Sequence, residues 1–170
     1  SQDLSRFVHR LQPDCLVSGR VGNGVGDYGS LGDNQIPTGR LEGYWETPAT
    51  LNDTWGYKAD DPNWKSVKTL LHLLVDLSSK GVNYLLNIGP RADGTVPQPS
   101  INRLLAIGKW MKTNSEAIYG TKATPYPYEF PWGGITQKGN RLYLLFTKWP
   151  DKRFTLPGLR SRVKKATLLA

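Results

Sequence analysis

Several residue types on which a function could depend are scarce in this chain of 170 residues. The single cysteine, Cys15, excludes a disulfide within the chain, and its apolar neighbours favour a small buried thiol. The only histidines are His9 and His72, and without a Cys/His cluster we expect no metal site. No apolar run approaches the roughly 20 residues that cross a membrane, so we expect no membrane partner.

Two common motifs are absent or incomplete. No Gly-x-Ser-x-Gly sequence supports a serine hydrolase. Residues 24–29 (Gly-Val-Gly-Asp-Tyr-Gly) match the glycine pattern of dinucleotide-binding loops, which requires a helix to follow at once. Residues 30–37 favour no helix, so we expect no cofactor. Residues 1–10 are polar and favour a helix over a signal peptide.

The charge balance is basic. The net charge is +8, from 22 Lys and Arg against 14 Asp and Glu. A basic balance of this size is a feature of proteins that bind nucleic acid. The basic residues are dispersed, however, and the one dense cluster consists of Arg160, Arg162, Lys164 and Lys165. Dispersed charge is typical of a solvated surface, so we expect no nucleic-acid partner.

The hydrophobic spacing along residues 1–120 predicts alternating strands and helices. The expected elements are a helix over 1–11, a buried strand over 15–21, a glycine-rich loop over 22–40, a strand over 44–50, a helix over 66–79, a strand over 83–88 and a helix over 100–118. Ser66 is expected to cap the second helix and Gly81 to end it, and Leu104 and Leu105 are expected to face the core. This order predicts a parallel sheet, typical of part of a (β/α)-barrel of the TIM type with its chemistry on the loops after the strands.

Residues 121–170 predict the start of an antiparallel β-domain. Residues 124–131 are rich in Pro and Tyr and are typical of a linker. Strands are expected over 133–137, 141–148 and 153–156, with a hairpin turn at 138–140. The strands are too few for a whole barrel or a whole sandwich. We therefore expect an α/β fold with the C-terminal portion of a (β/α)-barrel over 1–120, part of an antiparallel β-sandwich over 121–170, and a need for a missing N-terminal half of the barrel.

A carboxylate among aromatic rings lies in the second quarter of the chain. Glu46 stands between Trp45 and Trp55, with Tyr44 and Tyr57 at the edges. Aromatic rings cover the apolar faces of a sugar, and a carboxylate can transfer protons at a glycosidic oxygen. The same residues also fit a strand and a loop whose aromatic side chains simply lie in the core.

Further carboxylates fall between residues 22 and 53. They are Asp27, Asp33, Glu42, Glu46 and Asp53. A glycosidase needs two carboxyl groups, about 5 Å apart for retention or about 6.5–9.5 Å for inversion, and one must be protonated at the working pH. Each of these carboxylates also fits an ordinary surface charge.

Together these motifs resemble the retaining α-L-fucosidases of glycoside hydrolase family 29. The resemblance is carried by residues 46–57 and by 83–90 (Asn-Tyr-Leu-Leu-Asn-Ile-Gly-Pro), with 20–28, 108–110 and 116–120 in support. It implies an irregular (β/α)-barrel followed by a C-terminal β-sandwich. It also implies an exo-glycosidase that hydrolyses terminal α-linked L-fucose by double displacement with retention, without a metal or cofactor.

The resemblance implies catalytic roles as well. Asp33 best matches the family's acid/base residue, which many relatives carry as Glu, and Glu46 beside the aromatic residues is the rival. We favour Asp33. The family's nucleophile is an Asp in a Trp-rich context on an earlier strand, and no such motif precedes Arg20. We therefore expect the nucleophile outside this chain, along with the family's histidines that grip the sugar.

Substrate contacts follow from the same resemblance. Arg20 matches an arginine that contacts the fucose ring, and Trp55 matches an aromatic residue that packs on the fucose C6 methyl group. Trp45 and Tyr44 are further candidates for substrate binding. The partner is then a fucosylated oligosaccharide or glycoconjugate, and the location secreted, periplasmic or lysosomal. The alternative is a non-catalytic fucose- or glycan-binding module, which would keep the aromatic residues without the acid.

Overall fold

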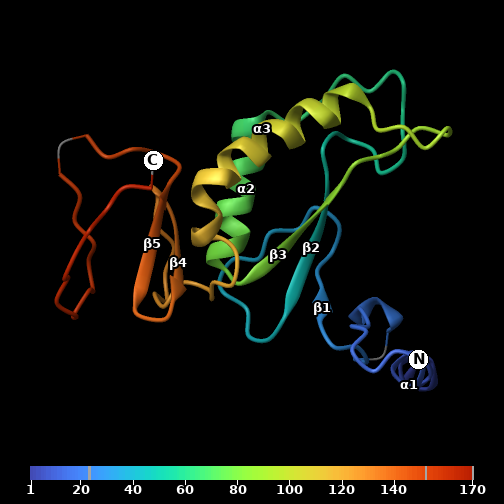
Figure 1. Cartoon of the computed structure of the whole chain (residues 1–170), viewed down its shortest axis with the longest axis horizontal. Helices are drawn as coiled ribbons and strands as arrows, with labels where there is room; N and C mark the ends of the chain where they lie inside the picture. The colour runs from blue at the N-terminus through green and yellow to red at the C-terminus, as the bar shows by residue number, and fades with distance from the viewer. Residues whose placement is uncertain (23, 152, 170) are drawn as a thin grey trace.

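The computed structural model describes residues 1–22, 24–151 and 153–169. In these residues the elements follow in the order α1 (Gln2–Leu11), the 3-10 turn η1 (Gly19–Val21), β1 (Gly29–Ser30), β2 (Trp45–Thr50), α2 (Val67–Ser79), β3 (Val82–Asn87), α3 (Gln98–Asn114), the 3-10 turn η2 (Ser115–Ala117), β4 (Gly133–Lys138) and β5 (Arg141–Phe146). They form three layers in Figure 1. The sheet β1-β2-β3 is followed by α2 and α3, and then by the hairpin β4-β5.

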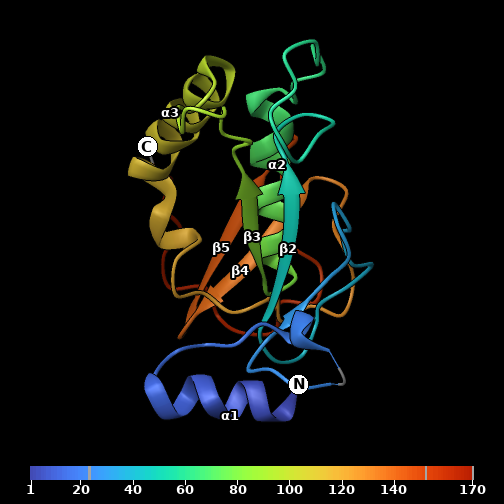
Figure 2. The ribbon, with the colours of Figure 1, turned by 90° about the vertical axis from the view of Figure 1, so that its right-hand side faces the viewer.

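The three-stranded sheet is parallel, as the sequence predicts. β2 pairs with β3 over all six residues of each strand, and β1 pairs with the first two residues of β2. Register partners in a parallel sheet point to the same face, so Ser30, Glu46 and Asn83 form one row across it. In Figure 2, α2 lies behind this sheet. On the front face Asn83 is exposed and Leu85 is 51% exposed, because no described segment covers them.

The helix α2 forms for the reasons that the sequence suggests. The Ser66 hydroxyl accepts the Thr69 amide at 3.0 Å, and Gly81 ends the helix with a φ of 78°. Leu70 and Leu77 are fully buried. The helix therefore supplies the centre of the described fold, with the sheet on one side and the hairpin on the other.

The helix α3 begins two residues before the expected start and packs differently from the expectation. Its Trp110 lies against a core between the helices and the hairpin, where Val75 and Leu145 are buried. Leu104 and Leu105, however, are 36% and 69% exposed. The expectation that these two leucines face the core is wrong within the described chain, because the described residues leave them exposed.

Two expected strands are not formed. Over 15–21 the chain makes a single β-bridge, from Ser18 to Tyr28, and then turns into η1. The Val17 amide donates to the Asp27 carboxylate at 2.7 Å instead of to a strand carbonyl, so no ladder extends there. Residues 153–156 also form no strand, although the Phe154 ring packs edge-on against Trp132 and Phe146.

The antiparallel hairpin confirms the expected turn, and it carries an aromatic cluster that the sequence analysis missed. β4 and β5 pair across a two-residue turn at 139–140. The cluster consists of Tyr126, Tyr128, Phe130, Trp132 and Phe146, with ring centroids 4.8–5.7 Å apart. Tyr126 is only 8% exposed. Residues 124–131 therefore pack on the hairpin, and the expectation of a linker is wrong.

Candidate functional site

The loops that follow the strands gather at one end of the sheet. In Figure 2, β2 and β3 point toward the loops over 51–65 and 88–97, whereas α1 lies at the opposite end. The carboxyl ends of parallel strands are where α/β folds place their sites. Polar groups on these loops, and on the loop after β1, are therefore the candidates for a site.

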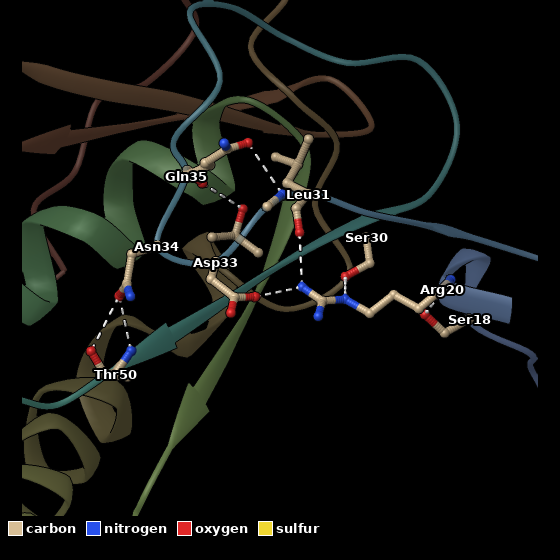
Figure 3. Close-up of polar contacts among 10 residues, drawn as sticks. Ser18, Arg20, Ser30, Leu31, Asp33, Asn34, Gln35 and Thr50 are labelled. Atoms are coloured by element: carbon tan, nitrogen blue, oxygen red, sulfur yellow. Dashed lines mark hydrogen bonds and ion pairs between the residues drawn. The ribbon is translucent and has the colours of Figure 1, made fainter. Parts of the chain in front are cut away.

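The most developed polar cluster joins Arg20 to the loop after β1. The Arg20 side chain donates from Nε to the Ser30 hydroxyl (2.8 Å) and from Nη2 to the Leu31 carbonyl (3.1 Å) and the Asp33 carboxylate (2.8 Å). Figure 3 shows the guanidinium between these three acceptors. The structure thus brings together two predicted site residues that lie 13 positions apart in the sequence.

The Arg20–Asp33 pair is accessible from outside. The two side chains are 52% and 51% exposed, so a ligand can reach the carboxylate. On the other side, the Ser18 hydroxyl accepts the Arg20 amide at 3.4 Å and holds η1 in its turn. An arginine fixed by three acceptors presents a planar, permanently charged group, which suits it to orient both a carboxylate and a polar ligand.

Glu46 lies within the strand β2, whereas Asp33 lies in the loop after β1. It is the second residue of β2 and the register partner of Ser30, whose hydroxyl Arg20 binds. Its backbone carbonyl accepts the Leu31 amide at 2.9 Å. Within the described ranges, its half-buried carboxylate takes part in no hydrogen bond or ion pair. Glu46 therefore belongs to the amino end of β2, whereas Asp33 follows the carboxyl end of β1.

The structure does not bring Trp45 and Trp55 together. Trp45 opens β2, and its Nε1 donates to the Glu42 carbonyl at 2.7 Å. Its ring lies against β1, where a Cβ at Gly29 would clash with it. Tyr44 precedes Trp45 and is 79% exposed. Trp55 lies in the loop beyond the other end of β2, whose last residue, Thr50, is about 16 Å from Trp45 by the rise per residue.

Trp55 is held at the carboxyl end by contacts that the sequence analysis did not find. Its carbonyl accepts Nδ2 of Asn87, the last residue of β3, at 2.6 Å. The Asp61 carboxylate shapes the same loop, because it accepts the amides of Asp53 (3.1 Å) and Asn63 (2.9 Å). These bonds leave the Trp55 side chain 39% exposed at the rim. Asn87 carried a sequence signal, since it lies in the 83–90 motif, whereas Asp61 and Asn63 did not.

Two of the other candidate carboxylates have structural partners. Asp27 accepts the Val17 amide (2.7 Å) and contacts His9 Nε2 (2.9 Å), which connects the loop to α1. The Val17 hydrogen bond, opposed by desolvation and assisted by His9, holds the pKa of Asp27 below its ordinary value. Asp53 accepts Nδ2 of Asn63 at 2.6 Å. These contacts account for both carboxylates without a ligand.

No group of three or more His, Cys, Asp or Glu side chains in the described part of the chain is arranged to hold a metal ion. Within 1–22, 24–151 and 153–169, no helix has both the length and the apolar character needed to cross a bilayer.

Comparison with known proteins gives a consistent result. Residues 1–116 match the family described as Alpha-L-fucosidase. The human tissue alpha-L-fucosidase is 35% identical over 152 residues, which cover 83% of this chain and 32% of that protein. This chain thus spans about a third of the length of the curated relatives it matches.

Solved structures agree. Alpha-L-fucosidase isoenzyme 1 from Paenibacillus thiaminolyticus has a TM-score of 0.80 and 35% identity, over 86% of this chain and 38% of that chain. The alpha-L-fucosidase from Vibrio sp. strain EJY3 has a TM-score of 0.81 and 38% identity, over 87% of this chain and 27% of that chain. The likeness to these structures covers more of this chain than the 116 residues that match the family.

Proposed function

The chain belongs to the alpha-L-fucosidase family, and from that premise we propose that it supplies part of a site that hydrolyses terminal α-linked L-fucose. The observation that carries the proposal is the accessible pair of Arg20 and Asp33 on adjoining loops. A carboxyl group that can be reached from outside and is oriented by an arginine is suited to transfer a proton at a glycosidic oxygen.

In this proposal Asp33 is the acid/base residue of a retaining double displacement. It protonates the leaving oxygen and later activates the water. The nucleophile is an aspartate supplied by an upstream segment outside this chain, about 5 Å from the acid/base residue, as retention requires. Glu46 is the alternative acid/base residue. Its place at the amino end of β2 weighs against it, because catalytic groups of (β/α)-barrels lie at the carboxyl ends of the strands.

Substrate contacts are assigned by the same placement. Arg20 orients Asp33 and contacts the fucose ring. Trp55, at the carboxyl end and partly exposed, packs on the C6 methyl group, a contact worth about 1–3 kcal/mol. The prediction that Trp45 and Tyr44 also bind the sugar stays a prediction, and their place at the opposite end of β2 weighs against it.

We further propose that residues 1–120 are the C-terminal portion of a (β/α)-barrel and that residues 121–170 begin a β-sandwich. Large apolar side chains lie uncovered among the described residues, among them Leu11 (66% exposed), Leu85 (51%) and Leu105 (69%). The missing N-terminal half of the barrel would cover such surfaces. The proposed substrate, a fucosylated glycan, places the protein in a secreted, periplasmic or lysosomal setting.

The test is turnover of an aryl α-L-fucoside. It compares this chain alone with the chain joined to the preceding part of the Paenibacillus relative, each as wild type and as Asp33→Asn. We expect turnover from the joined form, and its loss in Asp33→Asn, most strongly with a poor leaving group. The matched control is Asp60→Asn, which changes an exposed aspartate that lies 3.9 Å from Lys58.

Other outcomes have distinct meanings. Turnover by the chain alone that Asp33→Asn abolishes would show a complete site and contradict the external nucleophile. Retained turnover in Asp33→Asn would remove the acid/base assignment. Fucose binding without turnover in any form, unchanged by Asp33→Asn, would favour a non-catalytic glycan-binding module instead.

A further inference from the structure

The chain after β1 bulges away from β2, and Asp33 lies in the bulge. Three backbone amides of this segment donate to carbonyls of the neighbouring chain: Gly29 to Tyr44 (2.8 Å), Leu31 to Glu46 (2.9 Å) and Asn34 to Pro48 (2.8 Å). The acceptors advance by two residues each time, whereas the last two donors are three residues apart. The segment therefore holds one residue more than the strand opposite it, which defines a β-bulge.

A proline on β2 explains why the Leu31 carbonyl is free to bind Arg20. In a parallel ladder, a residue that donates to one strand position accepts from the position two residues further along. For Leu31, which donates to residue 46, that donor would be the amide of residue 48. Pro48 has no N–H. The Leu31 carbonyl therefore accepts Nη2 of Arg20 at 3.1 Å.

Asn34 closes the bulge with its side chain. By the same pattern the Thr50 amide should reach the backbone carbonyl of residue 34, but it donates to Asn34 Oδ1 at 3.0 Å. The Thr50 hydroxyl lies 3.3 Å from the same oxygen and closer, at 2.5 Å, to the Asn52 carbonyl, which is the better acceptor for its one proton. Thr50 is itself fixed, since it is 2% exposed and its carbonyl accepts Lys65 Nζ at 2.7 Å. The side-chain oxygen thus occupies the ladder position of a backbone carbonyl.

The backbone of Asn34 matches this role. Its φ is 56°, and among the described residues it is the one residue other than glycine with a positive φ. Asparagine tolerates this left-handed conformation better than most residues. A second contact braces the turn, because Gln35 Oε1 accepts the Gly32 amide at 3.2 Å across Asp33. Figure 3 shows Asp33 projecting toward Arg20 while Asn34 points to Thr50.

We propose that Asn34 is a positioning residue. Its side-chain oxygen binds the Thr50 amide and so fixes the chain to β2 immediately after Asp33, which holds the Asp33 carboxylate against Arg20. The role rests on the acid/base function proposed above for Asp33. Without this oxygen, the Thr50 amide loses its acceptor and the loop over 31–40 is released from the carboxyl end of β2. The Asp33 carboxylate would then move with the loop.

Two substitutions separate the side chain from the backbone conformation. Asn34→Gly keeps the positive φ accessible but removes the oxygen. Asn34→Asp keeps an oxygen that can accept from Thr50, so it should restore function. The control is Thr136→Val, which removes a buried hydrogen bond to the Ala117 carbonyl in the distant β4.

The first measurement is kcat/KM, in whichever form of the wild type turns over fucosides. An unactivated fucoside and an activated aryl fucoside are compared, because only the former depends strongly on proton donation. We expect Asn34→Gly to lose about 10²-fold on the unactivated substrate, as for a misplaced catalytic group, and much less on the activated one. Asn34→Asp should recover most of the loss. Equal losses on both substrates, or no loss, would overturn the proposal.

The second measurement is amide hydrogen exchange of residues 31–36 in this chain. We expect faster exchange in Asn34→Gly but not in Asn34→Asp or Thr136→Val. Unchanged exchange in Asn34→Gly would overturn the positioning role even if turnover falls. If no form of the wild type turns over a fucoside, the proposed function fails, and exchange alone still decides whether Asn34 holds the bulge.

Discussion

The substitution Arg20→Lys should separate the stability of the fold from the function of the site. It keeps the positive charge but replaces a planar fork with a single ammonium group. Arg20 uses two nitrogens to reach Ser30, Leu31 and Asp33. A lysine cannot hold all three acceptors in the same geometry, so the orientation of the Asp33 carboxylate is lost before the fold is.

The magnitudes follow from exposure. Because both charged side chains are about half exposed, their ion pair is worth only about 0–1 kcal/mol. The hydrogen bond to Ser30 adds about 0.5–1.5 kcal/mol. We expect Arg20→Lys to lower the free energy of unfolding by about 1 kcal/mol, and the melting temperature by about 2–4 °C for a chain of this size. Misplacement of the carboxylate should lower kcat/KM by about 10²-fold.

The assay combines circular dichroism melting of this chain with turnover of an aryl α-L-fucoside by the joined form, each as wild type and as Arg20→Lys. Arg6→Lys is the matched control, because Arg6 contacts Asp3 at 3.5 Å on the exposed α1, and both measurements should stay at wild type. Unchanged turnover in Arg20→Lys would refute the reasoning. So would a melting temperature more than about 8 °C lower with turnover reduced only in proportion, since Arg20 would then act as a structural tie.

Three further predictions concern the fold. Tyr84→Phe should stabilise the chain by about 1 kcal/mol in urea unfolding, because the buried Tyr84 hydroxyl has no hydrogen-bond partner among the described residues; a loss would reveal a partner. Leu70→Ala should cost about 2–5 kcal/mol, because Leu70 is 0% exposed; a loss below about 1 kcal/mol would contradict its place in the core. The Asn63 amide, opposed by desolvation, holds the pKa of Asp61 below 3.8, so stability should fall as pH drops from about 4 through that lowered pKa. Asp61→Asn should flatten this acid dependence, and an unchanged slope would refute it.

The local elements were predictable because their causes are local. The apolar spacing of residues 67–79, the cap at Ser66 and the turn at Gly81 define α2 without any distant contact. The strands over 45–50 and 82–87 and the hairpin turn at 139–140 follow from similarly short patterns. The resemblance of these motifs to fucosidases likewise depends on residue identity alone.

The predictions that the structure contradicts failed for non-local reasons. The strand expected over 15–21 is reduced to one bridge because the Asp27 side chain occupies the Val17 amide. The sequence of residues 124–131 resembles a linker because their aromatic side chains find partners only once the hairpin has formed beside them. Phe130, for example, packs on Trp132. The exposure of Leu105 depends on which segments lie beside α3, which helical spacing cannot specify.

The sequence by itself determined which chemical groups are present: an arginine, an aspartate and a set of aromatic residues of the kind that fucosidases carry. Only the tertiary structure decided how they are grouped. Parallel pairing placed Trp45 and Trp55 at opposite ends of β2, although the sequence makes them look like one cluster. A bulge closed by Asn34, opposite a proline, brought Asp33 within 2.8 Å of Arg20. Register and bulges depend on pairing between distant segments, so no local pattern encodes them.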